Sequence, residues 1–248
     1  MKKTAPLKNL LRDKAIPALT ATRPYFSMAE LRAWLTQRRI SWSATTLNSY
    51  LHAFTNDGVV YDAGRGWYSS LAQPLTLDRE HVAPVVALIE KAFPFLSFTV
   101  WSTQQINPWM HHLLGKFVTF VYVEKEGVSA VWELLKENGY DAHRDPTKKE
   151  ADKSFSVRET TLVVRAGSLV QAPVDGHFAR PEKILVDIAV ELQVLPLMDT
   201  DEFSSLFTTT VTTGRIEIAA MLRYANRREL MDKFLRLINQ LTSGNGVS

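Results

Sequence analysis

The first 73 residues carry apolar side chains at helical spacing. Leu47, Leu51 and Phe54 recur at three- and four-residue intervals, which places them on one side of a helix. Ser43 is a good N-cap residue, and Gly58 suits the left-handed residue that ends a helix. The pattern therefore predicts a helix that begins after Ser43 and buries one stripe in a core.

Small polar side chains occupy the other face of this helix; they are Thr45, Thr46, Asn48, Ser49 and His52. Two short β-prone runs, Val59–Asp62 and Trp67–Ser69, then flank the segment Ala63-Gly-Arg-Gly66. Its glycines supply the positive φ of a tight hairpin tip. We expect a hairpin with Arg65 held out at its tip.

Two further helices are predicted upstream. Leu7, Leu10 and Leu11 share a face of a short helix, which we expect Pro17 to end. The segment Phe26-Ser-Met-Ala-Glu-Leu31 is a capping box, with Ser27 as N-cap and Glu30 at the third helical position. This second helix runs to Gln37-Arg-Arg39, and a short turn leads to the third helix. Three helices and a hairpin are the order of a winged helix-turn-helix, a DNA-binding fold.

We place a domain boundary after Leu71-Ala-Gln-Pro74, giving domains of residues 1–73 and 74–248. In the second domain, helical patterns at 78–93, 128–138 and 181–192 alternate with strand patterns at 97–101, 117–123 and 159–165. The charged run at 145–153 is predicted as a solvated loop, and the chain is expected to be helical from Asp201 onward. The predicted fold class is α+β: an N-terminal winged helix-turn-helix followed by an α/β domain with a helical C-terminal end.

Charge strengthens the DNA-binding interpretation. Residues 1–73 hold ten Lys and Arg against four Asp and Glu, a net charge of +6, and the remainder carries −3. The candidate DNA-binding residues are Ser43, Thr45, Thr46, Asn48, Ser49, His52, Arg65, Arg39 and Arg38. Within that set, Thr45, Thr46, Asn48 and Ser49 are assigned to base edges, and Arg65 and Arg39 to the phosphate backbone. The alternative for Arg32, Arg38 and Arg39 is a solvated helix face without phosphate contacts.

Composition removes several chemical classes. The chain has no cysteine, which excludes disulfides, thiolate nucleophiles and cysteine-ligated metals. No phosphate loop or nucleophile elbow is present, and Glu182, Asp187 and Glu191 are expected to be solvated carboxylates on a helix surface. We therefore expect no enzyme, no catalytic residue, no cofactor and no metal. No uninterrupted apolar run approaches the roughly 20 residues that span a bilayer, so we expect a cytoplasmic protein without a membrane partner.

The chain also resembles the AbiEi-type antitoxins of bacterial abortive-infection toxin-antitoxin systems. The resemblance lies in the segment 26–69, in the pair Phe117-Val-Thr-Phe-Val-Tyr-Val-Glu and Val131-Trp-Glu-Leu-Leu135, and in Arg180-Pro-Glu-Lys-Ile-Leu-Val-Asp187. It implies a transcriptional autorepressor that binds its own operator, a double-stranded DNA. It also implies neutralisation of a nucleotidyltransferase-type toxin by the second domain.

Two alternatives from other classes stay open at this point. One is a metal-dependent nuclease that uses the winged helix for targeting, although the sequence has no acid-x-lysine element with an upstream Pro-Asp. The other is a winged helix that binds protein instead of DNA. The sequence leaves open the operator, the oligomeric state and the toxin's identity.

Overall fold

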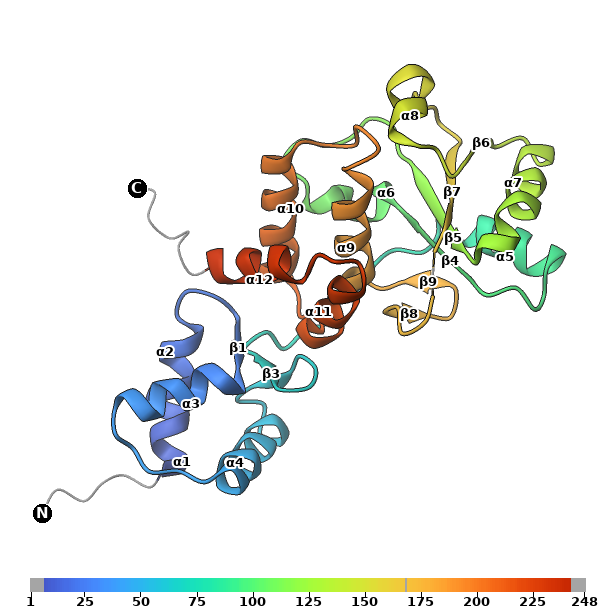
Figure 1. Ribbon diagram of the computed structural model, residues 1–248. Helices are drawn as coiled ribbons and strands as arrows, with labels where there is room; N and C mark the ends of the chain where they lie inside the picture. Colours follow the sequence, from blue (N-terminus) through green and yellow to red (C-terminus); the bar gives the residue numbers. More distant parts are fainter. Residues whose placement is uncertain (1–6, 168, 242–248) are drawn as a thin grey trace, which may run out of the picture. The chain divides into compact units, whose positions relative to one another are not determined.

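The computed structural model describes residues 7–167 and 169–241 (Figure 1). The protein is a mixed α+β structure, as predicted, and its chain divides into two compact units. The first unit takes residues 1–75, 210–223 and 231–248, and the second takes 76–209 and 224–230. The N-terminal segment therefore shares a unit with two segments from the far end of the chain.

The first unit begins with one continuous helical run. It comprises α1 (Leu7–Leu10), a π-helical turn (Leu11–Ala15) and α2 (Ile16–Thr20). The prediction that Pro17 ends this helix is wrong. A π turn lengthens the backbone hydrogen-bond pattern by one residue, which relieves the clash of a proline ring with the preceding turn. Leu11, Ala15 and Ile16 can thus all be buried in the core.

Both helix starts predicted downstream are confirmed. Helix α3 (Met28–Gln37) begins with the Ser27 and Glu30 capping box, and α4 (Ala44–Asn56) is capped by the Ser43 side chain. Gly58 follows α4 with φ of 68°. The stripes of these helices meet in one core, which contains Leu11, Leu31, Leu35, Leu47, Leu51, Phe54 and Val60.

A small antiparallel sheet completes this segment. Its strands are β1 (Tyr25–Ser27), β2 (Tyr61–Asp62) and β3 (Trp67–Ser69), in the order β1-β3-β2. Strand β1 was not predicted, because three residues between two helices carry little periodicity. Its pairing with β3 brings Tyr25 opposite Ser69 and joins the hairpin to the residues before α3.

The late segments of the first unit are bound to this sheet by specific hydrogen bonds. The Tyr25 hydroxyl donates to the Gly214 carbonyl at 3.2 Å and accepts from the Ile216 amide at 2.9 Å. The Ala219 amide donates to the Ala63 carbonyl beside the hairpin tip. Residues 214–219, far along the chain, therefore help to hold the hairpin in place.

The second unit is built on a six-stranded mixed sheet of order β6-β7-β5-β4-β9-β8. Strands β6, β7 and β5 are parallel, whereas β4 is antiparallel to β5 and parallel to β9. The bounds are β4 (Phe98–Ser102), β5 (Thr119–Val123), β6 (Asp141–Arg144), β7 (Thr161–Ala166), β8 (Val174–Asp175) and β9 (Phe178–Ala179). Strands β4, β5 and β7 were predicted to within two residues at each end, whereas the shorter strands β6, β8 and β9 were not predicted.

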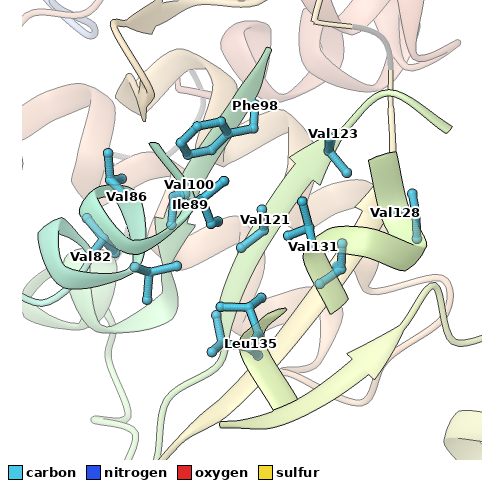
Figure 2. Close-up of a cluster of buried hydrophobic side chains, with 13 residues drawn as sticks. Val82, Val86, Ile89, Phe98, Val100, Val121, Val123, Val128, Val131 and Leu135 are labelled. Atoms are coloured by element: carbon cyan, nitrogen blue, oxygen red, sulfur yellow. The ribbon is translucent and has the colours of Figure 1, made fainter. Parts of the chain in front are cut away.

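Helices cover both faces of this sheet (Figure 1). On one face, α5 (Ala83–Ala92) and α7 (Val128–Glu137) bury aliphatic side chains against β4, β5 and β7. Figure 2 shows this packing for the labelled residues of α5, α7, β4 and β5. On the other face, α9 (Pro181–Glu191) lies against Tyr122 and Arg165. Shorter helical pieces connect them: α6 (Thr103–Ile106), η2 (Asn107–Trp109), η3 (Lys125–Gly127) and α8 (Lys148–Ser154).

Helix α8 corrects one prediction, since the run 145–153 was expected to be a solvated loop. Thr147 and Glu150 form a capping box, the same threonine-x-x-glutamate signal that starts helices elsewhere. The same box also places Glu150 in the first turn, where a negative charge stabilises a helix.

The chain ends in α10 (Thr200–Thr213), α11 (Ile218–Arg227) and α12 (Met231–Gln240). This agrees with the predicted helical end. In the part of the chain that the structure describes, none of the helices combines the length and apolarity needed to cross a bilayer.

The hairpin tip offers a stability test. Gly64 and Gly66 have φ of 89° and 79°, so alanine at either position pays about 1–2 kcal/mol of backbone strain. At Gly64 the added Cβ would also lie 2.7 Å from the Ala219 Cβ, whereas at Gly66 it meets nothing within 4 Å. We expect Gly64→Ala to lower the free energy of unfolding by at least about 1 kcal/mol more than Gly66→Ala, measured by urea denaturation. Equal losses would show that the hairpin is not packed on Ala219.

Candidate functional site

The exposed side of α4 carries the predicted polar face. Thr45, Asn48, Ser49 and His52 are exposed and spaced for one helix face, while Leu47, Leu51 and Phe54 on the other face are buried. Within the part of the chain that the structure describes, the Asn48 and Ser49 side chains have no hydrogen-bond partner. Their donors and acceptors are therefore available to a ligand. His52 lies 3.4 Å from the Asn56 amide nitrogen, which orients its ring.

Two other residues predicted to bind DNA, Ser43 and Thr46, form the N-terminal cap of α4. The Ser43 hydroxyl accepts from the Thr46 amide at 3.1 Å and donates to the Thr46 hydroxyl at 2.7 Å. A capping side chain holds the first turn of the helix in place. The geometry thus gives Ser43 and Thr46 a positioning role at the start of α4.

The predicted arginines lie on two segments: Arg38 and Arg39 follow the C-terminal end of α3, and Arg65 lies in the hairpin. Arg38 stacks its guanidinium on the Trp34 ring at 3.9 Å and donates to the Trp34 carbonyl. Arg39 follows with φ of 56° and an exposed side chain. A left-handed residue after a helix redirects the chain, and here it turns the chain toward α4.

Arg65 is exposed between two positive-φ glycines at the hairpin tip. The tip is anchored on one side, because the Met28 amide at the start of α3 donates to the Gly66 carbonyl at 2.9 Å. Arg65 therefore projects from a tip whose backbone is held on both sides, by Met28 and by Ala219.

A second polar assembly lies inside the second unit, where sequence analysis did not place one. Lys183, Asp187 and Glu191 follow each other at four-residue spacing along α9, and all three are buried. They face two polar side chains of the sheet, Tyr122 on β5 and Arg165 on β7, which are paired on neighbouring strands. We refer to these five residues, together with Tyr224, as the buried polar cluster.

Glu191 is the centre of one half of the cluster. It accepts from the Tyr122 hydroxyl at 2.7 Å and from two nitrogens of Arg165 at 2.7–3.1 Å. Arg165 also donates to Asp145 and to the Pro146 carbonyl. Burial raises the pKa of Tyr122, and the negative charges of Asp187 and Glu191 raise it further, so its hydroxyl stays protonated and donates.

Asp187 is the centre of the other half. Its carboxylate accepts from Lys183 Nζ at 2.5 Å and from the Tyr224 hydroxyl at 2.7 Å. Burial lowers the pKa of Lys183, while the Asp187 charge acts in the opposite direction. The Lys183 ammonium also lies 4.0 Å from the centre of the Tyr122 ring. These contacts satisfy one another, which is the arrangement that buried charges need.

The expectation that Glu182, Asp187 and Glu191 are solvated surface carboxylates is wrong, since each is at most 2% exposed. A signal was present in the sequence. Between these acids, α9 is apolar all round its circumference, with Ile184, Leu185 and Val186 followed by Ile188, and such a helix is buried on every side. Charges on a fully buried helix must be paired.

Over 7–167 and 169–241, no three His, Asp or Glu side chains are placed to hold one metal ion.

The buried polar cluster predicts a specific pattern of stability. Asp187→Ala leaves the Lys183 charge buried without its carboxylate, which costs about 3–5 kcal/mol. Replacing both residues in Lys183→Met/Asp187→Leu removes the stranded charge, so we expect the double variant to be more stable than Asp187→Ala. Chemical denaturation measures both, with exposed Asp152→Ala as the control. A double variant as unstable as the single one would contradict the pairing.

Comparison with known proteins places the chain in a family but gives no activity. The search of curated proteins found no match. Residues 46–244 match a family described as a family of unknown function (DUF6577). The match begins inside α4, includes the hairpin and extends through the second unit. Because it covers most of the chain, the protein belongs to this family.

Proposed function

We propose that α1 to β3 form a winged helix-turn-helix that binds double-stranded DNA. The observation that carries this proposal is α4, which buries its apolar stripe and exposes Thr45, Asn48, Ser49 and His52 along one face. Amide, hydroxyl and imidazole groups on an exposed helix can hydrogen-bond to base edges in the major groove. Helix α4 is the recognition helix in this proposal, and the β2–β3 hairpin is the wing.

The charged groups supply the second part of the interface. Arg65 at the wing tip and Arg39 after α3 contact phosphates, and the +6 net charge of residues 1–73 attracts a polyanion. Arg38 keeps its charge at the surface while stacked on Trp34. Ser43 and Thr46 hold the first turn of α4 through the cap, so their contribution to base contacts is positional.

We further propose that the DNA is the operator of the protein's own gene, and that the protein is an antitoxin for a nucleotidyltransferase-type toxin. This part is supported by the resemblance of segments 26–69, 117–135 and 180–187 to AbiEi-type antitoxins. A growth assay tests this part. A toxin encoded beside this gene should arrest growth when it is expressed by itself, and growth should continue when this chain is co-expressed. Continued arrest on co-expression would remove the antitoxin proposal without affecting DNA binding.

Asn48 tests base recognition. If its amide makes a bidentate base contact, Asn48→Ala should lower the preference for the operator over random duplex by about 1–3 kcal/mol. Fluorescence anisotropy with both duplexes measures the ratio. The matched control is Asn226→Ala, which removes an exposed asparagine of α11. An unchanged ratio for Asn48→Ala would refute the base contact.

Arg65 tests the wing. Losing one phosphate contact weakens specific and non-specific binding alike, and it lowers the slope of log affinity against log salt by about 1. We expect this for Arg65→Ala across a potassium chloride series. Arg158→Ala removes the same charge from the second unit, where the side chain is 72% exposed, and should leave the slope unchanged. If Arg65→Ala also leaves it unchanged, the wing tip does not contact DNA.

A further inference from the structure

The second unit contains a pocket that the DNA-binding proposal does not use. It has a volume of about 380 Å³ and is lined by Ala166, Gly167, Val170, Tyr224, Arg227 and Arg228. It opens where β7 ends, at Ala166, and the carboxyl ends of parallel strands are where open α/β sheets bind ligands. Its volume lies within the range of small-molecule sites.

Two adjacent arginines give the pocket its charge. Among the described residues that line it, none is acidic. Arg227 is held in place by hydrogen bonds to the Val170 carbonyl and the Gln171 side chain, both at 2.9 Å. Both arginines therefore bring a positive charge to one small concave surface.

Arg228 is the more enclosed of the two, with a side chain 24% exposed. Its Nη1 donates to the Tyr224 hydroxyl at 3.2 Å and lies 3.7 Å from Asp187 Oδ1. In the part of the chain that the structure describes, these are its only polar side-chain contacts, and they engage one nitrogen of three. A guanidinium carries five N–H donors, so Nε and Nη2 remain free for a ligand.

Asp187 does not neutralise this surface. Its carboxylate already accepts from Lys183 at 2.5 Å and from Tyr224 at 2.7 Å, and it contacts Arg228 only at the longer distance. Among the described residues that line the pocket, Arg227 and Arg228 therefore supply two positive charges and no acidic side chain opposes them.

We propose that this pocket binds a small phosphate-bearing molecule, with Arg227 and Arg228 as the ligands of its phosphate group. A phosphate monoester carries nearly two negative charges near neutral pH, which matches the two arginines, and guanidinium forks bind phosphate oxygens in pairs. The pocket is larger than a bare phosphate, and Val170, which is 61% exposed although apolar, lies at its wall. An organic group on the phosphate would cover that apolar surface.

The test uses the full-length protein and isothermal titration calorimetry at constant ionic strength. The probes are inorganic phosphate and phenyl phosphate. We expect saturable binding of inorganic phosphate at about millimolar affinity, as is typical of a ligand of few atoms. We expect phenyl phosphate to bind several-fold more tightly, because its ring covers Val170 and Ala166.

Variants assign the binding to this pocket. Arg227 is exposed, so Arg227→Ala should fold normally, and we expect it to weaken both probes at least about tenfold. Arg223→Ala removes an equal charge one turn earlier on α11 and should change affinity less than about twofold. Arg65→Ala should also leave phosphate binding intact, which separates this site from the DNA interface.

Arg228→Lys gives an independent readout. Lysine keeps the positive charge near Asp187 but loses the planar fork, so the protein should stay folded and bind phosphate more weakly. The proposal is overturned if the wild-type protein shows no saturable phosphate binding, or if Arg227→Ala and Arg228→Lys bind as tightly as wild type. It is also overturned if Arg65→Ala abolishes the binding. Equal affinity for the two probes would overturn the inference that the ligand carries an organic group on its phosphate.

Discussion

Burial of Leu47, Leu51 and Phe54 determines which side of α4 faces solvent. Each of these side chains contributes about 1.5–3 kcal/mol when it leaves water, so a rotation of the helix that exposed them would cost several kcal/mol. Thr45, Asn48, Ser49 and His52 are therefore held outward by the core beneath them. The Ser43 cap sets where the helix starts, and the two constraints together fix the position and the direction of the polar face.

The hairpin depends on a different constraint. A strand pair as short as β2 and β3 is marginal by itself, yet Arg65 needs a defined position to contact a phosphate. Three contacts fix the position of the hairpin. They are the pairing of β3 with β1, the hydrogen bond from Met28 to Gly66 and the hydrogen bond from Ala219 to Ala63. The C-terminal segments of the first unit thus contribute to the interface that we propose, although they carry none of its predicted contacts.

The sequence was informative where local chemistry decides structure. The two serine caps, the Gly58 stop and the paired glycines of the hairpin depend on residues within one turn of each other, and all are present as predicted. It was less informative where distant partners decide. Strand β1 exists because β3 pairs with it. Asp187 and Glu191 of α9 are buried because Arg165, Tyr122 and Tyr224 come from three other elements to bind them. Pro17 was misjudged because a π turn, which has no clear sequence signal, accommodates it.

We propose, above all, that α4 and the β2–β3 hairpin bind DNA. The most direct measurement is titration of the full-length protein with the duplex upstream of its own gene, and with a random duplex, across a salt series. If these elements bind DNA, the upstream duplex should bind more tightly and both duplexes should lose affinity steeply with salt. Absence of salt-dependent binding to either duplex would contradict this proposal and would leave the exposed face of α4 as a surface for a protein partner.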